Sequence, residues 1–214
     1  MERRKTQSPS KRYLIAYNFF SAALWAGVLT QTVLLVPVMG ASNLHSSLGT
    51  YTKYVQTLAI LEILHLLLGL LKSSLITTII QVSSRLLLVW GVCDLFSAPQ
   101  HSVAYASMLL AWSITEVCRY TYYVVNLASP EAAANGPGGL LNWLRYNTFF
   151  VLYPLGAGSE AWCVFRALPE AYAWSVQYYW LLVVILATYA PGLYNQYTHM
   201  IRQRRKNMRG KKKA

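Results

Sequence analysis

Apolar residues gather into six long runs along this chain, separated by short breaks of Gly, Pro, Ser and Asn. Crossing the hydrocarbon core of a bilayer takes about 20 mostly apolar residues in a helix. The pattern predicts spans over residues 13–38, 51–71, 75–96, 102–127, 140–158 and 172–197. Residues 159–169 fit either a continuation of the fifth helix or a segment at the membrane interface. We therefore expect an all-α integral membrane protein, folded as a bundle of six transmembrane helices.

The composition is typical of a membrane protein, and the distribution of charge argues against a nucleic-acid-binding protein. Of the 214 residues, 55% are hydrophobic and only 12% are charged, against about 25% charged in soluble domains. The net charge of +12 would suit a nucleic-acid binder, but it sits entirely in residues 1–12 and 201–214, because the charges between them cancel. We expect no nucleic-acid partner and three parts: a basic segment over 1–12, a membrane domain over 13–200 and a basic tail over 201–214.

The positions of the basic residues also predict an orientation. Lys and Arg near the ends of spans favour the cytosolic side, so both termini are expected in the cytosol, which an even number of crossings satisfies. Lys72 and the predicted site residue Arg145 then face the cytosol too. Lys211 and Lys212, fourth and third from the end, are similar to a dilysine retrieval signal and indicate the endoplasmic reticulum membrane. A basic tail drawn to an anionic leaflet is the alternative.

Several ionisable residues fall inside the predicted spans, where they are costly and are usually functional or paired. Glu62 lies three residues before His65, Gln81 four before Arg85, and Glu116 three before Arg119, so each pair shares one helical face. We expect Glu62 and Glu116 to neutralise Arg85 and Arg119 across helices. Ion pairing that only holds the bundle together and a functional role are both open for these residues.

The fifth span carries a different set of groups. Tyr153 and Glu160 are seven residues apart, with Pro154 and Gly156 between them, and two helical turns return residues at this spacing to nearly one face. A phenol and a carboxylate shielded from water suit acid–base chemistry. The plainer reading of such a tyrosine is an anchor at the membrane interface.

Four ordered motifs give the chain a family resemblance that covers nearly its whole length. They are Leu61-Glu-Ile-Leu-His-Leu-Leu-Leu-Gly69, Gln81-Val-Ser-Ser-Arg85, Trp112-Ser-Ile-Thr-Glu-Val-Cys-Arg-Tyr120 and Leu152-Tyr-Pro-Leu-Gly-Ala-Gly-Ser-Glu160. In this order they resemble the 3-hydroxyacyl-CoA dehydratase family, also called protein-tyrosine-phosphatase-like. The resemblance implies a lyase that removes water from very-long-chain (3R)-3-hydroxyacyl-CoA to give trans-2-enoyl-CoA, in the third step of fatty-acid elongation in the endoplasmic reticulum.

The resemblance also implies a set of site residues. Its catalytic pair falls on Tyr153 and Glu160, and which of them is acid or base stays open. Its other polar positions and glycine match Arg85, Glu116, Arg119, Arg145 and Gly156. An arginine would polarise the thioester carbonyl or hold the phosphates of CoA.

The resemblance also implies binding partners for this chain. Partners are the long-chain 3-hydroxyacyl-CoA substrate, membrane lipid, and the condensing enzyme and reductases of the elongase. No metal cluster or nucleotide fingerprint is visible, so no cofactor or metal is expected. The stretch 66–72 contains no Cys, so a cysteine-phosphatase mechanism has no basis. The alternatives are a non-catalytic membrane scaffold or regulator that binds elongase components or phosphotyrosine proteins, and, third, a transporter.

Overall fold

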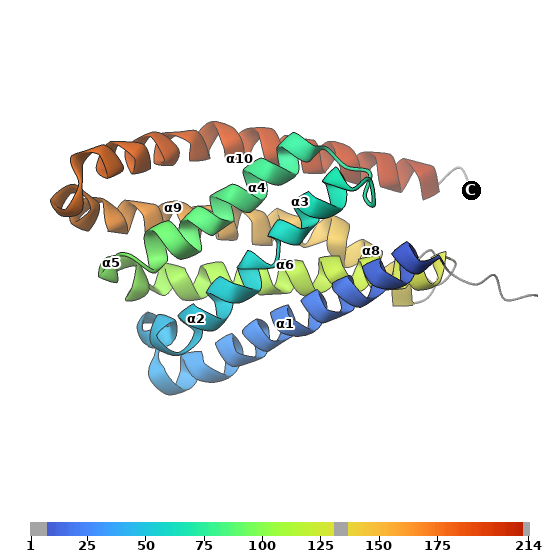
Figure 1. Ribbon diagram of the computed structural model, residues 1–214, viewed down its shortest axis with the longest axis horizontal. Helices are drawn as coiled ribbons and strands as arrows, with labels where there is room; N and C mark the ends of the chain where they lie inside the picture. Colours follow the sequence, from blue (N-terminus) through green and yellow to red (C-terminus); the bar gives the residue numbers. More distant parts are fainter. Residues whose placement is uncertain (1–7, 131–136, 212–214) are drawn as a thin grey trace, which may run out of the picture.

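The computed structural model describes residues 8–130 and 137–211, which form helices and turns without a strand (Figure 1). The elements in chain order are α1 (Pro9–Met39), η1 (Ala41–Asn43), α2 (Leu44–Thr57), α3 (Ile60–Leu67), α4 (Leu75–Leu86), the π-helical η2 (Leu87–Cys93), α5 (Ser97–Gln100), α6 (Val103–Ala128), α8 (Pro137–Asn147), α9 (Phe149–Trp174) and α10 (Val176–Lys211). An all-helical fold is thereby confirmed for the described residues.

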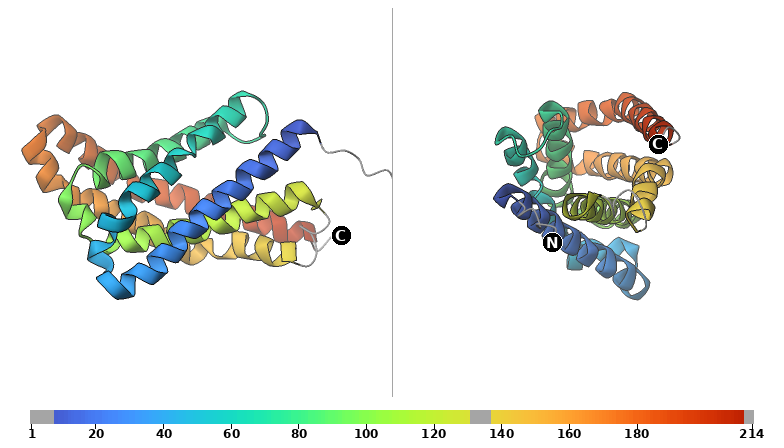
Figure 2. Two further views of the ribbon diagram at one scale, coloured as in Figure 1. Left: turned by 60° about the horizontal axis from the view of Figure 1, so that its bottom comes forward. Right: turned by 90° about the vertical axis from the view of Figure 1, so that its right-hand side faces the viewer.

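Six helical segments run back and forth along the long axis of the molecule. They are α1, α2 with α3, α4 with η2, α6, α9 and α10, and the start of α1 and the end of α10 lie at the same end (Figure 1). We call this the terminal end. Helix α6 packs against α1 on one side and α9 on the other, and α10 packs on α9. Viewed from the terminal end, α4 faces α9 and α10 across the bundle (Figure 2).

Local sequence sets where the long helices begin and end. The Ser8 side chain caps α1 by accepting from the Lys11 amide, and Gly40, with a φ of 82°, ends it. Ser74 and Ser102 cap α4 and α6 in the same way, through the amides of Thr77 and Ala104. A side-chain oxygen at the N-cap satisfies an amide that has no partner within the helix.

Two predicted spans differ from the observed helices. The second begins earlier, at Leu44, and is interrupted after Thr57, where α2 ends and α3 follows. In the region of the fifth span, α8 ends at Asn147 and α9 runs on to Trp174, so residues 159–169 continue a helix. The side chains of Asn147 and Thr148 donate to the carbonyls of Trp143 and Leu144, and such local bonds compete with the helical ladder.

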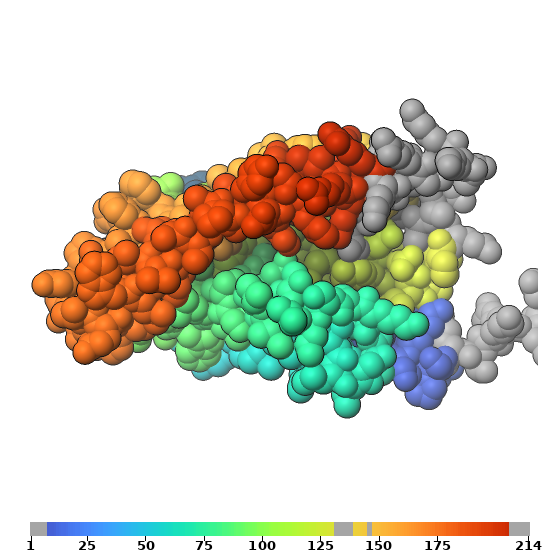
Figure 3. Space-filling model, turned by 90° about the horizontal axis from the view of Figure 1, so that it is seen from above, coloured from blue at the N-terminus to red at the C-terminus, as the bar shows by residue number. Residues whose placement is uncertain are grey.

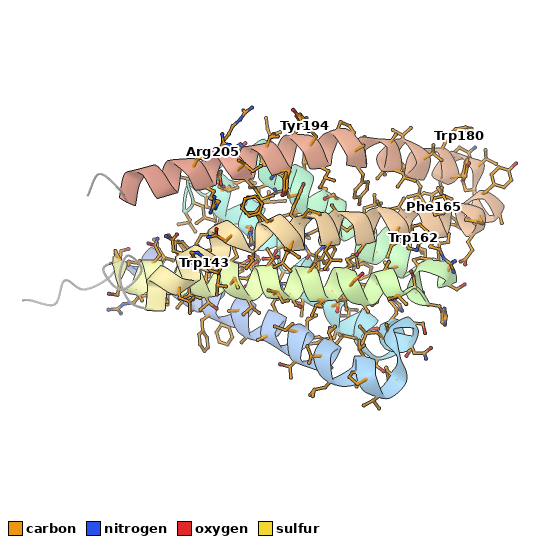
Figure 4. All side chains as sticks on the ribbon, turned by 180° about the vertical axis from the view of Figure 1, so that it is seen from behind. Trp143, Trp162, Phe165, Trp180, Tyr194 and Arg205 are labelled. Carbon is orange, nitrogen blue, oxygen red and sulfur yellow. The ribbon has the colours of Figure 1, made fainter. Side chains whose placement is uncertain are left out.

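Three helices are long and apolar enough to cross a membrane within the described residues. They are Pro9–Met39, Leu75–Cys93 and Val176–Arg205. Large aromatic side chains also face outward at both ends of the bundle: Trp143 near the terminal end, and Trp162, Phe165 and Trp180 in the opposite half (Figure 4). Such residues are enriched where a membrane meets water.

The basic tail predicted from residue 201 does not begin as a separate segment. Helix α10 continues without a break through this position to Lys211. Lys212, the other member of the dilysine pair, lies outside the described residues.

Candidate active site

Glu160 on α9 is held by donors from two neighbouring helices. The indole Nε1 of Trp112 on α6 donates to Glu160 Oε1 at 2.7 Å, and the hydroxyl of Tyr189 on α10 donates to Oε2 at 3.3 Å. One turn earlier on the same face of α9, Gly156 brings the helices close. A Cβ placed there would lie 3.6 Å from Ala111 Cβ and 3.8 Å from the Trp112 ring, which is ordinary van der Waals contact, so Gly156 lies at the packed contact between α9 and α6.

Arg85 on α4 joins this group from another side. Its guanidinium carbon lies 4.6 Å from the centre of the Trp112 ring, a cation–π arrangement. The same guanidinium forms an ion pair with Glu116, and its charge also acts on the carboxylate of Glu160. Arg85 is therefore shared between the Glu160 site and a second polar group deeper between α3, α4 and α6.

That second group, which we call the ion-paired cluster, consists of Arg85, Glu116, Arg119 and Glu62. Arg119 Nε donates to Glu116 Oε2 at 2.7 Å, while its two terminal nitrogens hold both oxygens of Glu62 at 2.7 and 3.2 Å. Tyr120 donates a further hydrogen bond to Glu62. Two Arg and two Glu cancel, so the predicted pairing of Glu62 and Glu116 with Arg85 and Arg119 across helices is confirmed.

Tyr153 lies on α9 two turns before Glu160 and is half-buried. Its hydroxyl is within electrostatic range of the Glu160 carboxylate. Within the described part of the chain it makes no hydrogen bond. The two residues are about 10 Å apart along the helix axis at 1.5 Å per residue. Pro154, which follows Tyr153, removes a backbone hydrogen bond from the first half of α9.

A groove leads to this group of residues from the side of the bundle. Helices α4 and α10 form two ridges with α6 between them, and the ridges separate toward the terminal end (Figure 3). At the opposite end they are joined, because Tyr178 on α10 donates to the Gly91 carbonyl of η2 at 2.7 Å. Arg85 lies on α4 and Tyr189 on α10, the two helices that border the groove, and Tyr189 donates to Glu160.

The structure thus collects most of the predicted site residues and adds two. Tyr153, Gly156 and Glu160 share α9, and Arg85 reaches them from α4. Arg145 lies on α8, but its side chain is outside the described residues.

The two added residues are Trp112 and Tyr189. Trp112 falls in the motif Trp112–Tyr120, whereas Tyr189 lies outside the four motifs that carry the family resemblance. The spacing of residues along one helix could not predict them, because Trp112 and Tyr189 bind the Glu160 carboxylate from two other helices.

The arrangement suits proton transfer. A carboxylate fixed by two neutral donors keeps further acceptor capacity, the Tyr153 phenol on the same helix has no hydrogen-bond partner among the described residues, and an arginine supplies positive charge where an anion would develop. Among the described residues, no three His, Cys, Asp or Glu side chains gather in a way that would hold a metal ion.

Comparison with known proteins gives a consistent set of relatives. Residues 56–210 match the family described as protein tyrosine phosphatase-like protein, PTPLA. The chain is 46% identical over 198 residues to the probable very-long-chain (3R)-3-hydroxyacyl-CoA dehydratase of Schizosaccharomyces pombe, covering 91% of this chain and 92% of the relative.

More distant relatives are named for the same activity. Identity is 34% to PASTICCINO 2 of Arabidopsis thaliana, with 91% of each chain covered, and 34% to dehydratase 2 of Homo sapiens, with 91% and 80% covered. Both are named very-long-chain (3R)-3-hydroxyacyl-CoA dehydratases. No solved structure matches the chain. The chain belongs to the protein-tyrosine-phosphatase-like family, PTPLA.

Proposed function

We propose that this protein is a very-long-chain (3R)-3-hydroxyacyl-CoA dehydratase, a hydro-lyase that forms trans-2-enoyl-CoA during fatty-acid elongation. The observation that carries the proposal is the carboxylate of Glu160, bound by Trp112 and Tyr189 and facing a groove beside Tyr153 and Arg85. Relatives at 34–46% identity over most of the chain carry the name of this activity.

Glu160 is the base in this mechanism. Indole N–H is a donor only, so the Glu160 oxygen that faces Trp112 accepts this bond, and the carboxylate keeps free acceptor capacity for a proton from the substrate. The carboxylate removes the α-proton of the substrate, which the thioester has made acidic. The electrons of the broken C–H bond pass into an enolate, whose oxygen is stabilised by the positive charge of Arg85.

Tyr153 is the acid. The enolate electrons form the double bond between Cα and Cβ as the C–O bond at Cβ breaks, and the Tyr153 hydroxyl gives its proton to the departing hydroxide, which leaves as water. Glu160 then gives its proton to water, and water gives a proton to the Tyr153 phenolate, so the enzyme is restored with no net gain or loss of protons. The Tyr153 hydroxyl and the Glu160 carboxylate are not hydrogen-bonded to each other within the described residues. This leaves room between them for the Cα and Cβ atoms of the substrate.

We also propose a placement in the membrane. The six helical segments alternate in direction and the described chain begins and ends at one end of the bundle, which supports six spans with both basic termini in the cytosol. The parts are then the cytosolic segment 1–12, the membrane domain 13–200 and the cytosolic tail 201–214. Part of the proposal is residence in the endoplasmic reticulum membrane, where the condensing enzyme and reductases of the elongase would be partners.

The test is dehydration by the purified full-length chain in detergent or vesicles, supplied with a long-chain (3R)-3-hydroxyacyl-CoA. We expect trans-2-enoyl-CoA from the wild type and a loss of about 10²- to 10⁴-fold in Glu160→Gln, because positioned acids and bases contribute factors of this size. The matched control is Glu170→Gln, which changes another carboxylate of the same helix. An inactive wild type would reject the proposal and leave the scaffold reading.

A further inference from the structure

Helix α4 presents a polar face that the reaction chemistry does not use. Thr77, Gln81 and Ser84 follow one another at the i, i+4, i+7 spacing of a single helical face, and all three are exposed. Yet α4 and η2 together form one of the segments apolar enough to cross a membrane. The hydroxyls of Thr77 and Ser84 donate to Ser74 Oγ and the Gln81 carbonyl, but the Gln81 amide would be costly to expose to hydrocarbon, so this face favours a polar environment.

An adjacent face of α4, about a quarter turn away around the helix, shows what a lipid-facing surface looks like here. Ile76 and Ile80 are 73% and 63% exposed, and Ser83 lies beside them. The polar face instead adjoins Arg85, which extends toward Trp112 and Glu116. It therefore lines the α4 wall of the groove, between the active site and the terminal end.

The hydrogen-bonding capacity of this wall is open. The side-chain amide of Gln81 makes no hydrogen bond within the described residues and offers both donors and an acceptor. Ser84 donates to its own helix, at the Gln81 carbonyl, and so keeps acceptor capacity. Across the groove, α10 carries Gln203, whose amide contacts His199.

The length of the polar wall is close to the length of the pantetheine arm of an acyl-CoA. From Arg85 to Thr77 it extends about 12 Å at 1.5 Å per residue. The pantetheine arm joins the thioester to the first phosphate through thirteen bonds, or about 15 Å at the extension of a peptide chain, and carries two amides and a hydroxyl. Beyond the wall, α10 reaches Arg202 and Arg205, exposed cations suited to phosphates (Figure 4).

We propose that Thr77, Gln81 and Ser84 form the binding wall for the pantetheine arm of the acyl-CoA substrate, with the phosphates at Arg202 and Arg205 at the terminal end. The inference rests on the proposed function. The thioester reaches Glu160, and the acyl chain leaves the groove sideways into the bilayer. Free CoA shares the arm and the phosphates, so it binds at the same wall.

The experiment compares two substrates on purified full-length protein: a long-chain 3-hydroxyacyl-CoA, and the same acyl group on N-acetylcysteamine, which lacks most of the arm and all phosphates. The variants are Gln81→Leu and Ser84→Ala, and the matched control is Ser83→Ala, the neighbouring exposed serine on the lipid face. We expect kcat/KM for the CoA substrate to fall about 3- to 10-fold per lost hydrogen bond. Turnover of the truncated thioester should not change, and Ser83→Ala should match wild type with both.

A second measurement is inhibition by free CoA, which should weaken in Gln81→Leu by a similar factor and stay unchanged in Ser83→Ala. Equal losses with both substrates would assign Gln81 a structural role and overturn the inference, as would no loss with either. In both cases wild-type dehydration would leave the proposed function intact. Failure of the wild type to dehydrate either substrate would instead remove the proposed function, and this inference with it.

Discussion

The ion-paired cluster and the Glu160 site both place carboxylates inside one helical bundle, but the donors that bind these carboxylates are charged in the cluster and neutral at Glu160. In the cluster, Glu62 and Glu116 meet arginines directly, and Arg119 alone makes three bonds to them. Glu160 meets the neutral donors of Trp112 and Tyr189 instead. A carboxylate bonded to arginine is locked in its charged form, whereas one held by neutral groups can still gain and lose a proton. The difference separates groups that hold the bundle from groups that react.

The largest effect that tests this difference should come from removing the hydroxyls of Tyr153 and Tyr189 one at a time. Tyr153→Phe should lower kcat by about 10²- to 10⁴-fold, because it removes the proton donor. Tyr189→Phe should cost only about 3- to 10-fold, because its bond to Glu160 is long, at 3.3 Å, and weaker than an ordinary hydrogen bond to a charged group. Steady-state rates of water elimination measure both. If the two losses were reversed, Tyr189 would be the acid and Tyr153 a packing residue.

Opening the ion-paired cluster should affect stability more than chemistry. Glu116→Leu leaves Arg85 and Arg119 without a shared partner, and breaking a buried ion pair costs about 3–5 kcal/mol. We expect a lower melting temperature in detergent and a lower yield of folded protein. The outer ion pair between Lys53 and Asp94 provides the control, since Asp94→Asn should cost about 1 kcal/mol or less. Similar losses in both variants would mean that the cluster is not a stabilising element.

A smaller effect should come from the indole that links the two regions. Trp112→Phe keeps an aromatic ring under Arg85 but removes the N–H bond to Glu160. Hydrogen bonds to charged groups contribute about 1.5–3 kcal/mol, so kcat should fall about 10- to 100-fold. Thermal stability should change little, because the ring remains. A large drop in stability with normal kcat would place Trp112 with the structural cluster.

The smallest effect concerns Glu170, a carboxylate at the end of α9 beyond the predicted spans. It accepts bonds from the Ser97 amide, the Ser97 hydroxyl and the Ala98 amide at 2.7–2.8 Å. Partial burial opposes ionisation, but these donors outweigh it and hold the pKa of Glu170 below its ordinary value. The lowered pKa means that this contribution to stability is present above the unfolded-state pKa near 4.3 and is lost as pH falls through the lower folded value.

Glu170→Gln should therefore lose about 1 kcal/mol of stability at neutral pH, as for the loss of a helix cap. Below about pH 4 the difference from wild type should shrink. Melting curves across this pH range measure it, and enzyme activity at neutral pH should stay normal. A constant difference at every pH would contradict the assignment.

The sequence predicted the helices well where apolar length decides them, as in α1 and α6, and poorly where a helix breaks inside an apolar run. The breaks after Thr57 and Asn147 contain no Pro or Gly, so neither hydropathy nor a helix-breaking residue marks them. The site was predictable as far as groups on one helix, such as Tyr153 and Glu160. The partners of Glu160 were not, because Trp112 and Tyr189 approach from other helices and only packing places them.

The placement of Tyr153 and Glu160 on one continuous helix separates access from chemistry. If α4 and α10 move apart to admit a long acyl chain, the bond between Tyr178 and Gly91 would hold them together at the other end. Motion between helices leaves distances within α9 unchanged. The proposed acid and base would therefore keep their spacing with substrates of different length, because the pitch of one helix sets it.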